Sequence, residues 1–141
     1  MAKLVKSIYT GSDVTALGEL TAADTIEGDI TFAADVDVNG AATGNVTVDN
    51  DGSFDMTAGN FFTCTPTGAI DLTFTNETAG QSGIILLVNT TPQVVTVDAD
   101  VFLSDADLTA INAAGTYLLG YYSPDGTNVY LSATPALTEG A

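Results

Sequence analysis

The sequence predicts an all-β fold: a single antiparallel β-sandwich or jelly-roll-like domain with at most one short helix. Apolar and polar residues alternate with a period of two through most of residues 28–132, the pattern of strands with one buried and one solvated face. Threonine supplies many of the polar positions, and its β-branched side chain packs well on a pleated sheet. Residue pairs that end in glycine separate these runs at short intervals, as expected for strands joined by tight turns.

The N-terminal part divides into an arm and the first strands. Residues 1–20 show no clean period and are predicted to form an N-terminal arm, so the β-domain is expected to span residues 21–141. Strands with one wet face are predicted at residues 29–32, 35–39 and 45–49. Two similar runs lie sixteen residues apart and are predicted to belong to two similar hairpins, because a solenoid needs about three copies: Gly28-Asp29-Ile30-Thr31-Phe32 and Gly44-Asn45-Val46-Thr47-Val48.

The strand pattern continues through the middle of the chain. Residues 61–65 are predicted to form a buried strand, and residues 70–75 alternate as the earlier runs do. Residues 84–88 are apolar at every position, which predicts a central strand covered on both faces or a strand with one face against another subunit.

One short helix and one hairpin are predicted near the C-terminus. Residues 104–112 are the helical candidate, with Ser104 as N-cap, Asp107 at the third helical position and Gly115 as the stop. Residues 117–131 form the strongest hairpin candidate, because a Ser-Pro-Asp-Gly turn joins two runs rich in tyrosine and aliphatic residues.

Charge is divided sharply along the chain. Lys3 and Lys6 are the only cationic side chains, whereas 18 Asp and Glu residues give a formal net charge of −16, and there is no histidine. An acidic body of this kind repels nucleic acids, whose binding requires Lys and Arg on phosphates, and it repels anionic membranes. Most enzyme mechanisms need a histidine or lysine as base, so we expect no enzymatic activity.

The candidate chemical sites all have simpler structural interpretations. Cys64 is the single cysteine, which excludes an intrachain disulfide or a cysteine zinc site and predicts a core residue. Residues 35–40 match the first half of a calcium loop, but the twelfth position is Val46 instead of Glu. The remaining acidic clusters are predicted to be solvated carboxylates that bind divalent ions weakly at most: Asp49, Asp51, Ser53 and Asp55; Asp98 and Asp100; Asp105 and Asp107. No catalytic, cofactor or metal site is therefore predicted.

The second half of the chain resembles a module common in structural proteins of phage virions. Residues 69–131 carry the resemblance through four segments: Ile70-Asp71-Leu72-Thr73-Phe74-Thr75-Asn76, the turn Ala79-Gly80-Gln81-Ser82-Gly83, Val95-Thr96-Val97, and the late hairpin around Ser123-Pro124-Asp125-Gly126. The class includes head decoration proteins and segments of tail and head fibres. Many fibre versions carry Trp and a Pro-rich insert, which residues 98–110 lack.

The resemblance implies a capsid decoration (cement) protein of a tailed phage, which binds the outer surface of the head and stabilises it. The expected partners are the major capsid protein and further copies of this chain in a homotrimer, with no nucleic acid, no membrane and no cofactor. Association is also expected from the residues, because the strand at 84–88 together with Leu118, Tyr121 and Tyr122 exceeds what one small sandwich can cover. The alternative is a tail-fibre or head-fibre module that binds a host-surface receptor; a bacterial surface or matrix module ranks third.

The arm is the candidate contact with the capsid or a neighbouring subunit. It places apolar anchors beside the only two cations, through Lys3, Leu4, Val5, Lys6, Ile8 and Tyr9. The alternative is a frayed terminus or an edge strand whose lysines prevent further pairing. Because the N-terminus lacks the apolar run of a signal peptide, we expect synthesis in the host cytoplasm and final location on the virion.

Overall fold

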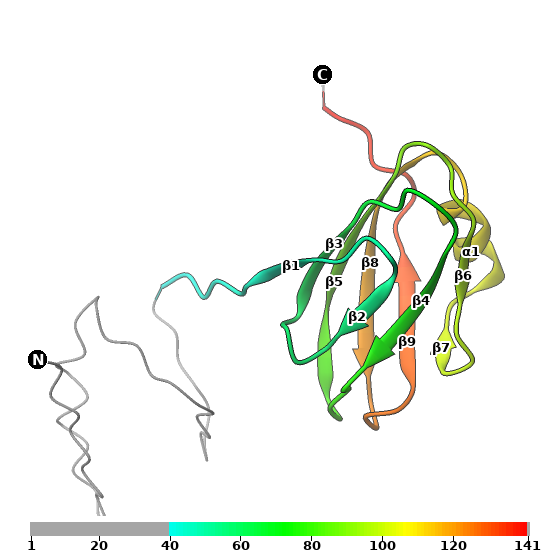
Figure 1. The fold of residues 1–141 in the computed structure, drawn as a ribbon. Helices are drawn as coiled ribbons and strands as arrows, with labels where there is room; N and C mark the ends of the chain where they lie inside the picture. The colour runs from blue at the N-terminus through cyan, green and yellow to red at the C-terminus, as the bar shows by residue number, and fades with distance from the viewer. Residues whose placement is uncertain (1–39, 141) are drawn as a thin grey trace, which may run out of the picture. The chain divides into compact units, whose positions relative to one another are not determined.

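Two β-sheets and one short helix make up the regular structure of the described part of the chain (Figure 1). The structure, a computed structural model, describes residues 40–140. The predicted arm at residues 1–20, the predicted domain start at residue 21 and the predicted strands at 29–32 and 35–39 lie outside the described residues.

The larger sheet has six strands and the smaller sheet has three. In spatial order the larger sheet consists of β1 (Val46–Val48), β3 (Phe61–Cys64), β5 (Gln81–Asn89), β8 (Gly115–Ser123), β9 (Val129–Ala133) and β7 (Val101–Phe102). The smaller sheet consists of β2 (Ser53–Asp55), β4 (Ile70–Thr75) and β6 (Val95–Val97).

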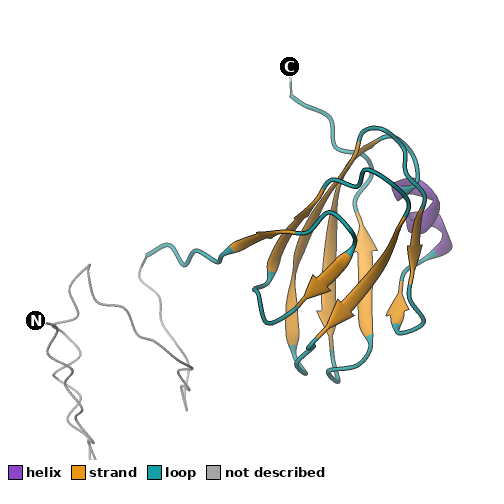
Figure 2. Ribbon diagram, viewed as in Figure 1, coloured by secondary structure: helices purple, strands orange, loops and turns teal. Residues whose placement is uncertain are grey.

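The first six strands alternate between the two sheets (Figures 1 and 2). Each sheet therefore receives every second strand in the same direction, and the pairs β1–β3, β3–β5, β2–β4 and β4–β6 are all parallel. Only β5–β8 and β8–β9 are antiparallel, and β7 again pairs parallel with β9. The mostly-β prediction with one short helix is confirmed, but the prediction of antiparallel sheets is wrong for the first six strands. Period-two alternation is the same in both kinds of sheet, so it carries no information about strand direction.

Only the second copy of the sequence repeat lies within the described residues, and β1 in this copy does not form a hairpin with the next strand along the chain. The copy at residues 44–48 contains β1, which pairs in parallel with β3 and places Val46 opposite Phe61. The partner segment, Gly59-Asn60-Phe61-Phe62-Thr63, is itself a third and weaker copy of the pattern, fifteen residues after the second. The turn after β1 leads into the other sheet at Gly52, whose φ of 88° favours glycine.

The hydrophobic core lies between the two sheets and is rich in aromatic side chains. The ring of Phe54 in β2 lies 5.2 Å from that of Phe62 in β3, and Phe74 in β4 lies 5.5 Å from Tyr121 in β8. These distances between ring centroids are typical of favourable tilted aromatic pairs. Cys64 is fully buried in the same core, as predicted.

The helix and the final hairpin agree with the sequence. Helix α1 (Asp105–Ile111) begins after Ser104, whose Oγ accepts a hydrogen bond of 3.1 Å from the backbone N–H of Asp107, as predicted. The helix ends at Ile111 with Asn112 as its C-cap, within the predicted span, but Gly115 is not its stop and instead begins β8. Strands β8 and β9 form the predicted antiparallel hairpin.

Two asparagines fasten α1 to the connection between β5 and β6. The buried Asn89 donates from Nδ2 to the backbone oxygens of Gln93 and Ile111 and accepts from the Gln93 N–H. Asn112 accepts from the Val95 N–H and donates to the carbonyl of Val95 and to that of Leu108. These side chains satisfy backbone groups at the end of a helix that would otherwise lose their partners.

Candidate functional site

The carboxylates of the domain belong mainly to its turns. The described residues contain no Lys, Arg or His, so within them a carboxylate has no cationic side chain as partner. Asp55 accepts hydrogen bonds from the Thr57 N–H at 3.0 Å, the Thr57 hydroxyl at 2.7 Å and the Asn76 amide at 3.0 Å, which lower its pKa. Asp125 accepts from the N–H and side-chain amide of Asn128 and from a neighbouring backbone N–H, which lower its pKa too.

The predicted acidic cluster at residues 49–55 separates into two parts. Asp49 accepts from the Asp51 N–H at 3.2 Å, and Asp51 accepts from the Ser53 N–H at 2.9 Å. Partial burial, followed by the neighbouring Asp51, raises the pKa of Asp49, whereas hydrogen bonds from Asp49 and Ser53 lower the pKa of Asp51. Asp55 bonds to Thr57 and Asn76 instead.

Across residues 40–140, no three His, Cys, Asp or Glu side chains are grouped so that they could hold a metal ion. The acidic positions of the half calcium loop, at residues 35 and 37, lie outside the described residues. Val46, its twelfth position, is an exposed strand residue of β1.

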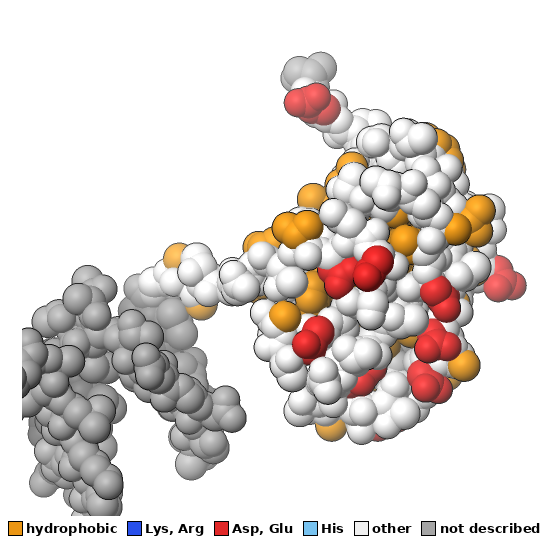
Figure 3. All heavy atoms as spheres, in the orientation of Figure 1, with side chains coloured by type: hydrophobic (Ala, Val, Ile, Leu, Met, Phe, Trp, Pro, Cys, Tyr) orange, Lys and Arg blue, Asp and Glu red, His pale blue; other side chains and the backbone are white. Residues whose placement is uncertain are grey.

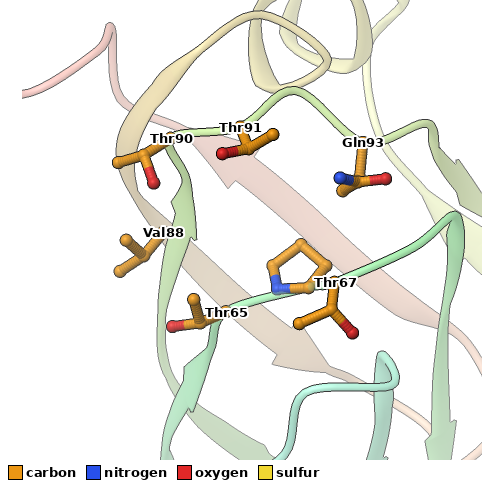
Figure 4. Close-up of a pocket in the computed structure, with 7 residues that line it drawn as sticks. Thr65, Thr67, Val88, Thr90, Thr91 and Gln93 are labelled. Atoms are coloured by element: carbon orange, nitrogen blue, oxygen red, sulfur yellow. The ribbon is translucent and has the colours of Figure 1, made fainter.

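One hollow of about 320 Å³ opens at one end of the domain, between the β3–β4 connection and the end of β5 (Figure 4). It is lined by Thr65, Pro66, Thr67, Val88, Thr90, Thr91 and Gln93. The lining offers hydroxyl and amide groups, but it has no titratable side chain to act as an acid or a base.

Two buried titratable groups of the core, Cys64 and Tyr121, face away from solvent. Burial, followed by the charges of Asp49 and Asp51, raises the pKa of the Cys64 thiol to about 11, which makes it a poor nucleophile. Tyr121 is 4% exposed, its hydroxyl has no hydrogen-bond partner, and burial raises its pKa to about 12. Tyr121 was expected to be among the apolar side chains that one small sandwich cannot cover. This expectation is wrong, because Tyr121 lies in the core.

The outer face of the six-stranded sheet is apolar. Strand β5 is central, as predicted: Ile85 and Leu87 are fully buried in the core, while Ile84 on the opposite face is 42% exposed. The register aligns further apolar side chains with it, of which Leu86 and Leu118 are half-buried and the others are exposed. We call this set the outer face: Val46, Val48, Phe61, Ile84, Leu86, Leu118, Tyr122, Tyr130 and Phe102. None of the six strands contains an Asp or a Glu.

Charge lies elsewhere on the domain. The smaller sheet carries exposed Asp55 in β2 and Asp71 in β4, and most of the remaining described carboxylates lie in loops and in the first turn of α1. Figure 3 shows these side chains spread over the side on which β2 and β4 lie in front. The two sheets therefore present chemically different surfaces, one acidic and one uncharged.

The predicted contact residues of the arm, Lys3, Leu4, Val5, Lys6, Ile8 and Tyr9, lie outside the described residues. Four members of the outer face were predicted from the sequence: Ile84 and Leu86 in the apolar run at 84–88, and Leu118 and Tyr122. Val46, Val48, Phe61 and Phe102 were missed, because their place on this face depends on parallel pairings that the alternation pattern does not reveal. Tyr130 was missed too, although it lies opposite Tyr122 in the predicted antiparallel hairpin.

No protein-family model, no curated protein and no solved structure matches this chain. Among the described residues, α1 is the longest helix and it falls well short of the length needed to cross a bilayer.

Proposed function

We propose that this chain is a structural protein of a tailed-phage virion, a capsid decoration (cement) protein that binds the outside of the head and stabilises it. The observation that carries the proposal is the separation of charge: a carboxylate-bearing small sheet and loops on one side, and an uncharged six-strand sheet on the other. Such a module can turn its acidic side to solvent and use its uncharged side for protein contacts. The resemblance of residues 69–131 to virion β-domains supports the same class.

The proposed role is structural and involves no catalytic step or cofactor. We include in the proposal the closer fold assignment, a sandwich-like packing of the two sheets as in virion β-domains. The protein would be made in the host cytoplasm and act on the virion surface, in contact with the major capsid protein and with its own copies. Many copies on one head would make even a modest contact effective, because repeated attachment raises overall avidity.

The arm is the proposed capsid contact, and a truncated chain tests it. The variant begins at Thr10, which removes both lysines and the apolar anchors at residues 4–9. Purified heads lacking this protein are mixed with the full and the truncated chains, and bound protein is measured after sedimentation. We expect the truncated chain to keep its far-ultraviolet circular dichroism spectrum and to bind at least tenfold more weakly.

A matched variant separates charge from apolar anchoring. Lys3 and Lys6 are both replaced by Gln, which keeps the length and apolar residues of the arm. If this variant loses head binding as strongly as the truncated chain does, the contact depends on the charge of the two lysines. If the truncated chain binds heads as tightly as the full chain, the arm assignment is wrong; if neither chain binds heads, the decoration role is wrong.

A fibre module is the second candidate, and the alternation of strands β1 to β6 between the two sheets favours it. Parallel strands that alternate between two sheets can repeat along one axis, as they do in β-helices. Immunogold labelling of intact virions distinguishes the two: label over the head surface supports decoration, and label confined to fibres supports receptor binding.

A further inference from the structure

The outer face of the six-stranded sheet carries large apolar side chains that are exposed among the described residues. Val48 is 70% exposed, Val46 is 56% exposed, and Tyr122 and Tyr130 are each 48% exposed. In register, Val46, Phe61 and Ile84 form one row across β1, β3 and β5. A second row runs from Tyr122 through Tyr130 to Phe102, whose ring stacks on Tyr130 at 4.8 Å. Contiguous apolar surface of this kind marks a site of protein contact.

A hollow interrupts this face at Gly120. The hollow has a volume of about 350 Å³ and is flanked by Tyr122, Tyr130 and Ser132. Gly120 lies in the middle of β8, between Ile84 of β5 and Ser132 of β9. A side chain at this position would occupy part of the hollow.

The fold of one subunit gives no reason for a glycine at this position. The φ angle of Gly120 is not positive, and a Cβ there would approach no atom closer than 3.6 Å, the distance to Ser132 Oγ. Gly83, in contrast, is required, because a Cβ there would collide with the Asn60 carbonyl and the Tyr121 ring. A glycine inside a strand weakens the strand and often marks the close approach of another chain or ligand. We infer that Gly120 leaves room for a group from outside the subunit.

The distribution of charge favours a second copy as the source of that group. Each copy carries a net charge of −16, so two copies repel unless their carboxylates are far apart. Packed sheets usually lie about 10 Å apart. If two copies meet through their six-stranded sheets, three such spacings separate the two three-stranded sheets, which therefore lie about 30 Å apart. That separation exceeds the Debye length of about 10 Å at 0.1 M salt. A cationic partner would instead be attracted to the side bearing Asp55 and Asp71.

We propose that the outer face of the six-stranded sheet is the contact between copies of this chain, with a side chain of one copy packed into the hollow over Gly120 of another. The contact stands independently of capsid binding. It assigns a surface to the association that the apolar strand at residues 84–88 predicted, although two faces that meet in this way pair copies into dimers and not into the homotrimer that the resemblance implies. The Debye length rises to about 30 Å at 0.01 M salt, so repulsion between the acidic sides weakens the contact at that low salt and added salt strengthens it.

Light scattering on the full 141-residue chain after size exclusion tests the proposal. Val48→Asp introduces a charge at a 70% exposed position of the outer face, and Gly120→Val fills the hollow with a side chain suited to a strand. Thr75→Asp is the matched control, because Thr75 is exposed on β4 of the smaller sheet. Circular dichroism and thermal unfolding check that each variant is folded.

We expect the wild-type chain and Thr75→Asp to have the mass of two subunits, and to associate more tightly in 0.5 M salt than in 0.01 M salt. We expect Val48→Asp and Gly120→Val to raise the dissociation constant at least tenfold. If Val48→Asp does not fold, Gly120→Val alone decides. A wild-type chain with the mass of one subunit at both salt concentrations overturns the proposal. So does an unchanged dissociation constant in every folded outer-face variant. Heads are absent from these measurements, so the result does not depend on the decoration role.

Discussion

Replacing Asn89 by alanine should destabilise the domain by about 3 kcal/mol, through three lost hydrogen bonds. Asn89 is fully buried, and its Nδ2 donates to the Gln93 oxygen at 3.1 Å and to the Ile111 oxygen at 2.9 Å. Its Oδ1 accepts from the Gln93 N–H at 2.9 Å. The side chain thus ties the β5–β6 connection to the last turn of α1.

The magnitude follows from what the substitution leaves behind. A typical hydrogen bond contributes about 0.5–1.5 kcal/mol net, so three contribute about 1.5–4.5 kcal/mol. Alanine removes only one partner of each bond and leaves the backbone groups of Gln93 and Ile111 to find others. Water can reach the half-buried Gln93, whereas Ile111 is fully buried, which places the expected loss near the middle of the range.

The assay is urea unfolding followed by far-ultraviolet circular dichroism, at one fixed protein concentration because association adds to apparent stability. Asn50→Ala is the control, since exposed Asn50 accepts one bond, from the Thr65 N–H at 2.7 Å, and should lose under about 1 kcal/mol. Asn112→Ala breaks the second set of bonds between α1 and β6. The double variant should lose less than the sum of the single losses, because both side chains hold the same helix. A loss for Asn89→Ala no larger than that for Asn50→Ala would refute the reasoning.

Two further outcomes are expected from the pKa shifts. The Cys64 thiol, with its pKa raised to about 11 by burial, should react with a thiol reagent at pH 8 far more slowly in the folded protein than in urea; similar rates would place Cys64 at the surface. The folded state lowers the pKa of Asp125 below its ordinary value of 3.8, so this carboxylate contributes stability above that pH and loses it as pH falls through the lowered pKa. Asp125→Asn, which does not titrate, should therefore show a smaller fall in the urea midpoint between pH 5 and pH 2; an equal fall would show that the Asn128 contacts do not stabilise the charged form.

The positions of the strands and of the helix could be predicted from the sequence because their signals are local. Alternation over a few residues identified β1 and β4, and the wholly apolar run at 84–88 identified the centre of β5. Ser104 and Asp107 located the start of α1, because a cap and its backbone donor lie three residues apart on the chain. The β8–β9 hairpin was also predicted correctly, since a short turn forces the two strands that it joins to be antiparallel neighbours.

Strand partners and the outer face depended on the tertiary structure. The turn at Gly52 leads from β1 into the other sheet, so β1 meets β3 in parallel and a correctly predicted strand has an unexpected neighbour. Only that pairing brings Val46, Phe61 and Ile84 into one row, although they are separated by many residues in the chain. Gly120 likewise becomes informative only when its neighbours are known, because the sequence does not show whether a glycine has room for a side chain. Composition determined that the chain is acidic and alternation that it is mostly β, whereas register between distant segments decided which face of the domain is free of charge.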